Sequence, residues 1–161
     1  MSGKEVASVV ETLPDARALA EVNRVIERAV GSWKTSDRVK RAALPSYRYD
    51  PFDLPDMRFF VAQDADGRVA GVATLAAVKE GEGLPGLPSR LLHGLFVDPP
   101  RTHRGIGRAL LNAVEAAARE EGVHALVVRA HIDSQGFFAK AGYEAHASAA
   151  YPYAMARRLS G

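Results

Sequence analysis

Residues 95–122, LFVDPPRTHRGIGRALLNAVEAAAREEG, constrain what this chain can fold into more than any other segment. An apolar strand runs into a Pro-Pro turn, and a basic loop with two glycines then opens an amphipathic helix. Glycines let a backbone approach a ligand closely, and the free N–H groups at the start of a helix bind phosphate. The arginines at this point, Arg101, Arg104 and Arg108, add positive charge. The segment therefore predicts a cradle for a phosphate-containing ligand.

A tight strand-to-helix turn with solvated arginines would produce a similar sequence. Arginine at the positive end of a helix is unfavourable unless an anion offsets it, however, and such a local conflict is typical of a functional site. The loop lacks the Lys-Ser/Thr ending of a P-loop. A second pattern, Gly81, Gly83 and Gly86, formally matches G-x-G-x-x-G, but Pro85 interrupts it and no helix follows. We therefore expect no dinucleotide site there.

The composition is that of one soluble domain. The chain has 161 residues, 47% hydrophobic and 25% charged, and we expect a single domain over residues 1–161. No apolar run is long enough to cross a bilayer and residues 1–12 do not resemble a signal peptide, so we expect a cytoplasmic protein without membrane contact. The absence of cysteine excludes disulfides, thiolate nucleophiles and cysteine zinc ligands, and we expect no metal. A net charge of +2 is small for a nucleic-acid-binding protein.

Hydrophobic periodicity predicts a mixed α+β domain. We expect helices over residues 15–30, 36–43, 105–121 and 134–141. We expect strands over residues 5–12, 58–63, 69–78, 91–97, 125–130, 143–147 and 153–159. Residues 64–68 predict a hairpin turn, because Asp and Gly supply its backbone conformations, and residues 45–57 and 79–89 predict loops.

Two of these elements carry finer expectations. In the 105–121 helix, Glu115 falls on the face opposite the apolar stripe, where it would pair with Arg119 four residues on. In the 91–97 strand, the interior Gly94 indicates a bulge or a close approach of the backbone to a ligand.

Residues 91–143 resemble the core of the GNAT acetyltransferase superfamily. The hallmark of that family is a strand, V-x-P, then (R/Q)-x-x-G-x-(G/A) opening a long helix, then a strand and an F-Y-x-x-x-G-F segment. Residues 97–99 match V-x-P, residues 105–107 match the glycine motif, and residues 137–143 match the last segment. The resemblance implies a mostly antiparallel mixed sheet of six to seven strands flanked by about four helices. The strands at 91–97 and 125–130 would be parallel and splayed apart.

The resemblance also implies a ligand and a reaction. The protein would transfer an acetyl group from acetyl-CoA to a primary amine of a small molecule or a protein, and it would form a homodimer as many members do. Backbone N–H groups of residues 104–109 would hold the pyrophosphate, and the 95–97 strand would pair with the pantetheine arm. The cofactor-binding residues so implied are Leu95, Phe96, Val97, Thr102, His103, Arg104, Gly105, Ile106, Gly107, Arg108, Ala109, His131, Ser134, Phe138 and Lys140.

Three positions depart from the family pattern. Thr102 occupies the usual Arg/Gln position, so Arg101 or Arg104 would supply the charge instead. His131 stands where an Asn often contacts the pantetheine, and imidazole still donates a hydrogen bond. Phe138 stands where many members carry a tyrosine that protonates the leaving thiolate. Either another group is the acid or the thiolate leaves unaided, since a thiol of pKa about 8.5 is a fair leaving group.

Acyl transfer to an amine requires a neutral amine, a polarised carbonyl oxygen and a departing thiolate. Without a cysteine, we expect direct attack by the amine in a ternary complex, with a backbone N–H near Phe96 or Val97 polarising the carbonyl. His93 is the first candidate base because it lies on the strand leading into the cradle, although a half-buried structural histidine fits equally well. Glu82 is the second candidate, but we favour a solvated loop glutamate there.

Aromatic residues supply the other candidates. Tyr143, Tyr151 and Tyr153 are candidates for the missing acid, with packing as the alternative for each. The aromatic residues that would wall the acceptor site, or belong to the core, are Trp33, Tyr47, Tyr49 and Phe52.

The leading interpretation is thus an N-acetyltransferase. A sensor or partner domain that binds acyl-CoA with little or no turnover is the alternative, and the departures at Thr102 and Phe138 favour it. A nucleic-acid-binding module would show salt-sensitive affinity for DNA, and the small net charge argues against it.

Overall fold

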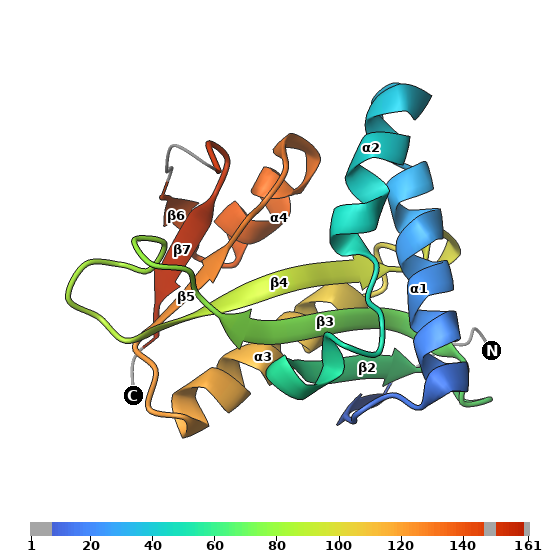
Figure 1. The fold of residues 1–161 in the computed structure, drawn as a ribbon, viewed down its shortest axis with the longest axis horizontal. Helices are drawn as coiled ribbons and strands as arrows, with labels where there is room; N and C mark the ends of the chain where they lie inside the picture. The colour runs from blue at the N-terminus through green and yellow to red at the C-terminus, as the bar shows by residue number, and fades with distance from the viewer. Residues whose placement is uncertain (1–7, 147–150, 160–161) are drawn as a thin grey trace.

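A seven-stranded sheet organises residues 8–146 and 151–159, which are the residues that the computed structural model describes (Figure 1). Along the chain the strands are β1 (Ser8–Glu11), β2 (Arg58–Gln63), β3 (Val69–Ala77), β4 (Ser89–Val97), β5 (Ala125–Val128), β6 (Glu144–Ala145) and β7 (Met155–Arg158). The helices are α1 (Ala16–Gly31), α2 (Asp37–Tyr47), α3 (Ile106–Glu120) and α4 (Gln135–Lys140). The strand order in the sheet is β1-β2-β3-β4-β5-β7-β6. The expected fold class is confirmed.

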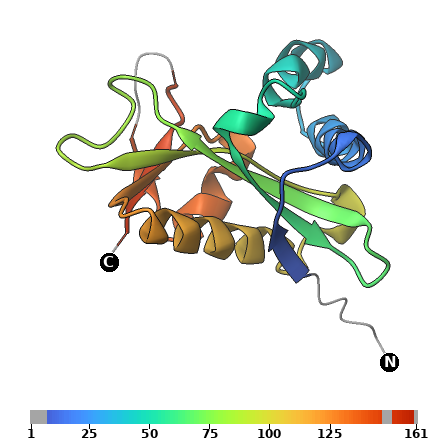
Figure 2. The same cartoon turned by 60° about the horizontal axis from the view of Figure 1, so that its bottom comes forward.

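The helices cover both faces of the sheet, as Figure 2 shows for α3 on one side and α1 with α2 on the other. Successive strand residues point to opposite faces, so Phe60 packs in the core under α3 while Phe59 packs in the core under α1. The buried residues of α3 are Ile106, Leu110, Leu111, Val114, Glu115, Ala117 and Ala118. Those of α1 are Leu19, Val22, Val25, Ile26, Ala29 and Val30.

β4 and β5 are parallel neighbours that separate along their length. They pair from Ser89 opposite Ala125 to Leu92 opposite Val128. β4 then continues to Val97 with its other edge paired to β3, whereas β5 ends at Val128. Among the described residues, the β4 edge after Leu92 is therefore open toward β5. This confirms the expected splay.

A bulge in β4 lies where the two strands separate. Thr74 of β3 is opposite Gly94, and Leu75 is opposite Leu92, so His93 is the extra residue. A Cβ at Gly94 would lie 2.7 Å from the Phe96 ring and 3.0 Å from the Tyr49 hydroxyl. The glycine that indicated a bulge or a close approach in the sequence thus permits close packing beside the bulged His93.

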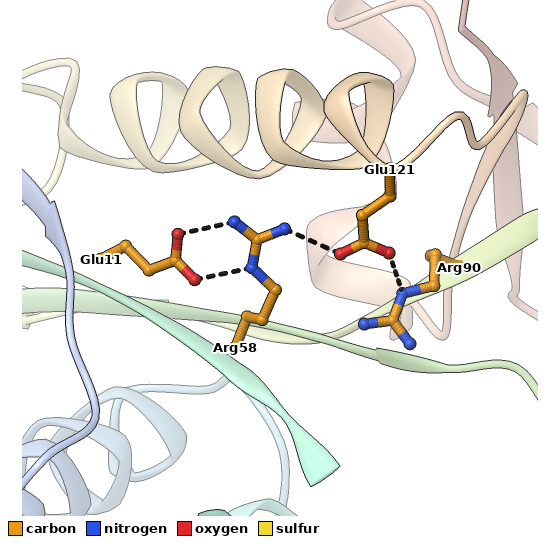
Figure 3. Close-up of polar contacts among 4 residues, drawn as sticks. All are labelled: Glu11, Arg58, Arg90 and Glu121. Carbon is orange, nitrogen blue, oxygen red and sulfur yellow. Dashed lines mark hydrogen bonds and ion pairs between the residues drawn. The ribbon is translucent and has the colours of Figure 1, made fainter. Parts of the chain in front are cut away.

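A network of two carboxylates and two guanidinium groups fixes the C-terminal end of α3 to the sheet (Figure 3). Arg58 of β2 donates two hydrogen bonds of 2.6 Å to Glu11 and one of 2.7 Å to Glu121. Arg90 of β4 forms an ion pair of 3.0 Å with the other Glu121 oxygen. These cations offset a carboxylate that sits unfavourably at the negative end of a helix. Arg58 also holds the pKa of Glu11 below its usual value.

Glu115 is the clearest departure from the sequence-based prediction. Instead of lying on an exposed face, it is only 3% exposed and accepts hydrogen bonds from the Tyr143 hydroxyl at 2.7 Å and from Arg157 Nη1 at 2.9 Å. Arg157 belongs to β7 and Tyr143 lies just before β6. The expectation was wrong because partners from the C-terminal strands convert a polar position of α3 into a buried one.

Element boundaries differ in smaller ways. α2 continues through Pro45 to Tyr47 rather than ending before Leu44, because Pro45 stands in the last turn and the Arg48 N–H still bonds the Leu44 carbonyl at 3.0 Å. β5 ends at Val128 rather than at residue 130. Residues 5–7 and 147 of the expected strands lie outside the described part of the chain. Within the described ranges, no helix is both long and apolar enough to cross a membrane.

Candidate active site

The separation of β4 and β5 opens a cleft of about 420 Å³ between the two strands, the start of α3 and the end of α1. Most residues expected to bind the cofactor line it: Leu95, Phe96, Val97, Thr102, His103, Gly105, Ile106, Gly107, Arg108, His131, Ser134 and Phe138. The expected residues Arg104, Ala109 and Lys140 are not among its lining residues. The Ala109 N–H already bonds the Gly105 carbonyl at 3.0 Å inside the helix. The structure therefore brings together twelve of the fifteen residues.

The start of α3 presents backbone N–H groups to this cleft. Gly105 is the N-cap with a φ of 81°, a left-handed conformation that favours glycine, and no side chain caps the helix. His103, two residues earlier, also has a positive φ of 64°. Because helical bonding begins with the Ala109 N–H, the N–H groups of residues 106–108 precede the helical ladder. The geometry suits an anion at the positive end of the helix.

Gly107, a lining residue of the cleft, lies where the start of α3 approaches Phe137 of α4. A Cβ there would lie 3.3 Å from the Phe137 ring and 3.6 Å from Leu95. Glycine at this position therefore lets the start of α3 approach Phe137 closely.

Arg101 lines the cleft and also contacts two carboxylates. Its Nη2 lies 2.7 Å from Asp64, whose pKa the contact holds below the usual value, and its Nε lies 4.0 Å from Asp98. The Thr102 hydroxyl donates to the Pro99 carbonyl at 3.1 Å. Arg101 and Arg108 both line the cleft, and Asp64 and Asp98 offset the charge of Arg101.

Trp33 and His131 face each other within the cleft lining, with ring centroids 3.9 Å apart. Trp33 follows α1, and His131 follows β5. The His131 Nδ1 accepts the Asp133 N–H at 3.2 Å, and burial lowers the pKa of the ring. The neutral ring therefore carries its proton on Nε2 and is a hydrogen-bond donor.

His93, the bulged residue, lies at the inner end of the cleft. Its Nδ1 is 2.9 Å from the Tyr49 hydroxyl, which is 2.6 Å from Thr74 Oγ1. Burial lowers the pKa of His93, so the ring is neutral at pH 7. Burial also raises the pKa of Tyr49, which keeps the phenol protonated. Tyr49, 3% exposed, is thus a core residue that contacts the site through His93.

A second cavity of about 440 Å³ adjoins the cleft at His93. Its lining residues are Ser46, Tyr47, Lys79, His93, Arg129, Ala130, Tyr151, Pro152 and Tyr153. Four of these, Tyr47, His93, Arg129 and Ala130, also line the cleft, so the two spaces share a wall.

Glu82 is not the solvated loop residue that we favoured. It is 6% exposed and accepts hydrogen bonds from Arg129 Nε at 2.5 Å, Arg129 Nη2 at 2.9 Å and the Lys79 N–H at 2.9 Å. Burial alone would raise the pKa of Glu82, but these donors outweigh it and the pKa lies below the usual value. Glu82 lines neither cavity. Arg129 was not identified from the sequence. The sequence feature that could have indicated it is its position directly after a buried strand.

The other aromatic candidates lie in different environments. Trp33 lines the cleft, Tyr47 lines both the cleft and the second cavity, and Tyr151 and Tyr153 line the second cavity. Phe52 is 88% exposed. Tyr143 is in neither lining; its hydroxyl donates to Glu115, and burial raises its pKa.

Comparison with known proteins agrees with this architecture. The sequence model of the Acetyltransferase (GNAT) family matches residues 25–143. The chain belongs to the GNAT acetyltransferase family. The matched residues of this GNAT protein include His93, both glycines of the cradle and the final segment through Tyr143. A search of curated protein sequences finds no match.

Solved structures share the GNAT fold at low sequence identity. The PaiA N-acetyltransferase from Thermoplasma acidophilum, in complex with coenzyme A, has a TM-score of 0.73 at 17% identity, over 94% of this chain and 99% of that one. A GCN5-related N-acetyltransferase from Rhodopseudomonas palustris has a TM-score of 0.72 at 21% identity, over 99% of each chain. A GNAT acetyltransferase from Brucella melitensis, in complex with acetyl-CoA, has a TM-score of 0.63 at 21% identity, over 96% of this chain and 90% of that one.

Proposed function

We propose that this protein is an acetyl-CoA-dependent N-acetyltransferase that acetylates a primary amine by direct attack in a ternary complex. The observation that carries the proposal is one continuous cleft with the N–H groups of the α3 start at one end and His93 at the other. A phosphate-binding helix start and a neutral base in one space are what amine acetylation from a CoA thioester requires.

The lining of the cleft offers groups for the parts of acetyl-CoA. The N–H groups of residues 106–108 would hold the pyrophosphate, with Arg108 beside them. The open edge of β4, residues 93–97, would pair with the amides of the pantetheine arm, and His131 would donate from Nε2. Bound acetyl-CoA supplies an activated acetyl group as a thioester.

His93 is the proposed general base. When its Nδ1–H donates to the Tyr49 oxygen and the Tyr49 hydroxyl donates to Thr74, Nε2 keeps a free lone pair. A neutral amine forms a bond to the acetyl carbon, the carbon–sulfur bond breaks, and the amine proton passes to Nε2. The Tyr49 oxygen then stabilises the imidazolium through Nδ1–H.

The thiolate leaves without a protein acid in this proposal. Phe138 lines the cleft at the position of the family tyrosine and has no proton to donate. The Tyr143 hydroxyl is directed to the Glu115 carboxylate, which gives it a structural role. A thiolate of pKa about 8.5 departs readily near neutral pH.

A sensor that binds acyl-CoA without turnover is the second candidate, because Phe138 replaces the family acid. The test is incubation with acetyl-CoA and a panel of amines, with free thiol and acetylated amine both measured. Equal amounts of the two products support the enzyme. Binding of acetyl-CoA with an intact thioester for every amine supports the sensor.

A further inference from the structure

We infer that the second cavity binds a small amine that also carries a carboxylate, an amino acid, with the carboxylate at Arg129 and Lys79. The inference rests on the proposed function, since it names the acceptor of that reaction. Arg129 lines both the cleft and the second cavity, whereas Lys79 lines the second cavity alone, so the carboxylate would lie on the second-cavity side of Arg129.

Arg129 is held in a way that leaves one edge available. Its Nε and Nη2 donate side-on to the two oxygens of Glu82, at 2.5 and 2.9 Å. A guanidinium group has five N–H donors, so three remain after this pair, two of them on Nη1. The edge formed by the two terminal nitrogens matches a second carboxylate in a bidentate arrangement.

Glu82 and Tyr151 fix the orientation of this edge. Glu82 is 6% exposed and is itself held by the Lys79 N–H at 2.9 Å. The ring of Tyr151 stacks on Arg129, with the guanidinium carbon 4.2 Å from the ring centroid. Because contacts on one edge and one face already hold the Arg129 guanidinium in place, the side chain loses little conformational freedom when a ligand binds its remaining edge.

The charge around the cavity favours an anion. Lys79 and Arg129 are both lining residues, and Glu82 offsets one of their two charges from behind Arg129. The described lining residues include no Asp or Glu. Residues 147–150, whose placement is not described, are Ala-Ser-Ala-Ala and add no charge. Asp53, whose charge acts on His93, is not a lining residue.

The rest of the cavity suits the body of an amino acid. His93 lines it at the junction with the cleft, where the acceptor nitrogen must lie. The amine would therefore lie at β4, and the carboxylate would lie beside Lys79 and Arg129, which follow β3 and β5. Tyr47, Pro152 and Tyr153 supply an apolar and aromatic wall. Polycationic acceptors would place a second positive charge against Lys79 and are disfavoured.

Calorimetric titration into the CoA-loaded protein tests the inference without requiring turnover. The probes are amino acids and their decarboxylated amines: L-phenylalanine with phenethylamine, L-tryptophan with tryptamine, and L-leucine with 3-methylbutylamine. For at least one pair we expect the amino acid to bind about tenfold or more tightly than the amine, as one charge-assisted contact provides. Equal or weaker binding of all three amino acids overturns the inference.

Two variants locate the carboxylate. Lys79→Gln changes an exposed side chain, and the double variant Glu82→Gln/Arg129→Gln replaces the ion pair by two neutral side chains. In each variant, the affinities for the amino acid and for its amine should differ by no more than about threefold. Arg68→Gln removes one charge at the opposite end of β3, in the turn before Val69, and should leave the ratio unchanged. If both cavity variants keep the wild-type ratio, the inference is wrong.

Turnover of the same probes separates this inference from the proposed function. Acetylation of the amines with no preference for the amino acids would support the enzyme and refute the carboxylate site. Carboxylate-dependent binding without any acetylation would support the site and refute the enzyme.

Discussion

The Tyr49 hydroxyl lies 2.9 Å from Nδ1 of His93, a residue 44 positions later in the chain. Tyr49 is itself held by Asn23 of α1, which bonds both its N–H at 2.9 Å and its carbonyl at 2.7 Å. The segment between α2 and β2 therefore determines the orientation of the His93 imidazole in the β4 bulge. This contact leaves Nε2 as the nitrogen available to a substrate.

Replacing His93 tests the base. His93→Gln should lower kcat/KM by about 10²- to 10⁴-fold, the usual contribution of a general base, without changing CoA affinity. Burial lowers the pKa of His93, and a base acts only when neutral. The wild-type rate should therefore fall only below about pH 6.5, and the variant should lose this acidic limb. His124→Gln, at an exposed histidine before β5, is the control and should keep the wild-type profile. An unchanged pH profile in His93→Gln removes His93 as the base.

Tyr49→Phe separates positioning from packing. Loss of the oxygen that accepts Nδ1–H destabilises the imidazolium, so the acidic limb should move to lower pH and kcat should fall about tenfold. Thr74→Val removes the other Tyr49 partner and should lower stability by about 1 kcal/mol while leaving the pH profile in place. The measurements are kcat against pH and urea unfolding. A Tyr49→Phe profile identical to wild type would limit Tyr49 to packing.

The two ends of α3 give a matched test of the cradle. Gly105 has a φ of 81° and Gly122 a φ of 78°, and a Cβ at either glycine meets no atom within 4 Å. Alanine at either position should therefore cost about 1–2 kcal/mol of stability through backbone strain. Gly105→Ala should also weaken CoA binding about tenfold, because the cap directs the N–H groups of residues 106–108. Equal CoA affinity in Gly105→Ala and Gly122→Ala would contradict the cradle.

Tyr143→Phe tests the structural role of the buried carboxylate. Glu115 would keep Arg157 but lose the Tyr143 donor, so the protein should lose about 1–3 kcal/mol in urea unfolding. At a temperature where the variant is folded, kcat should equal that of wild type. Tyr153→Phe keeps the ring that lines the second cavity and removes only a hydroxyl at a residue 46% exposed, so stability and kcat should both stay unchanged. A fall of kcat in either variant, with CoA binding intact, would identify that tyrosine as the acid.

The local structure of the candidate site was predictable. The proposed cradle is one strand, one turn and one helix start within residues 95–108, so the glycines, the charge and the periodicity appear together in the sequence. Gly94 indicated the irregularity of β4 in the same way, because a missing side chain is visible in the sequence.

Contacts between distant residues were not predictable in this way. Glu82 and Arg129 are 47 positions apart, and Glu115 and Arg157 are 42 apart. Periodicity describes which face of an element a residue occupies, but the fold decides whether another strand covers that face. For this reason Glu82 and Glu115 were both expected at the surface and are both buried.

The central claim is tested most directly by mass spectrometry. The protein is mixed with acetyl-CoA and with the amino acid and amine probes, and the products are measured. The proposed function predicts an N-acetylated probe in an amount equal to the free CoA released, with both reduced at least about a hundredfold by His93→Gln. Acetyl-CoA that is bound by the protein and yet recovered intact with every probe would contradict it.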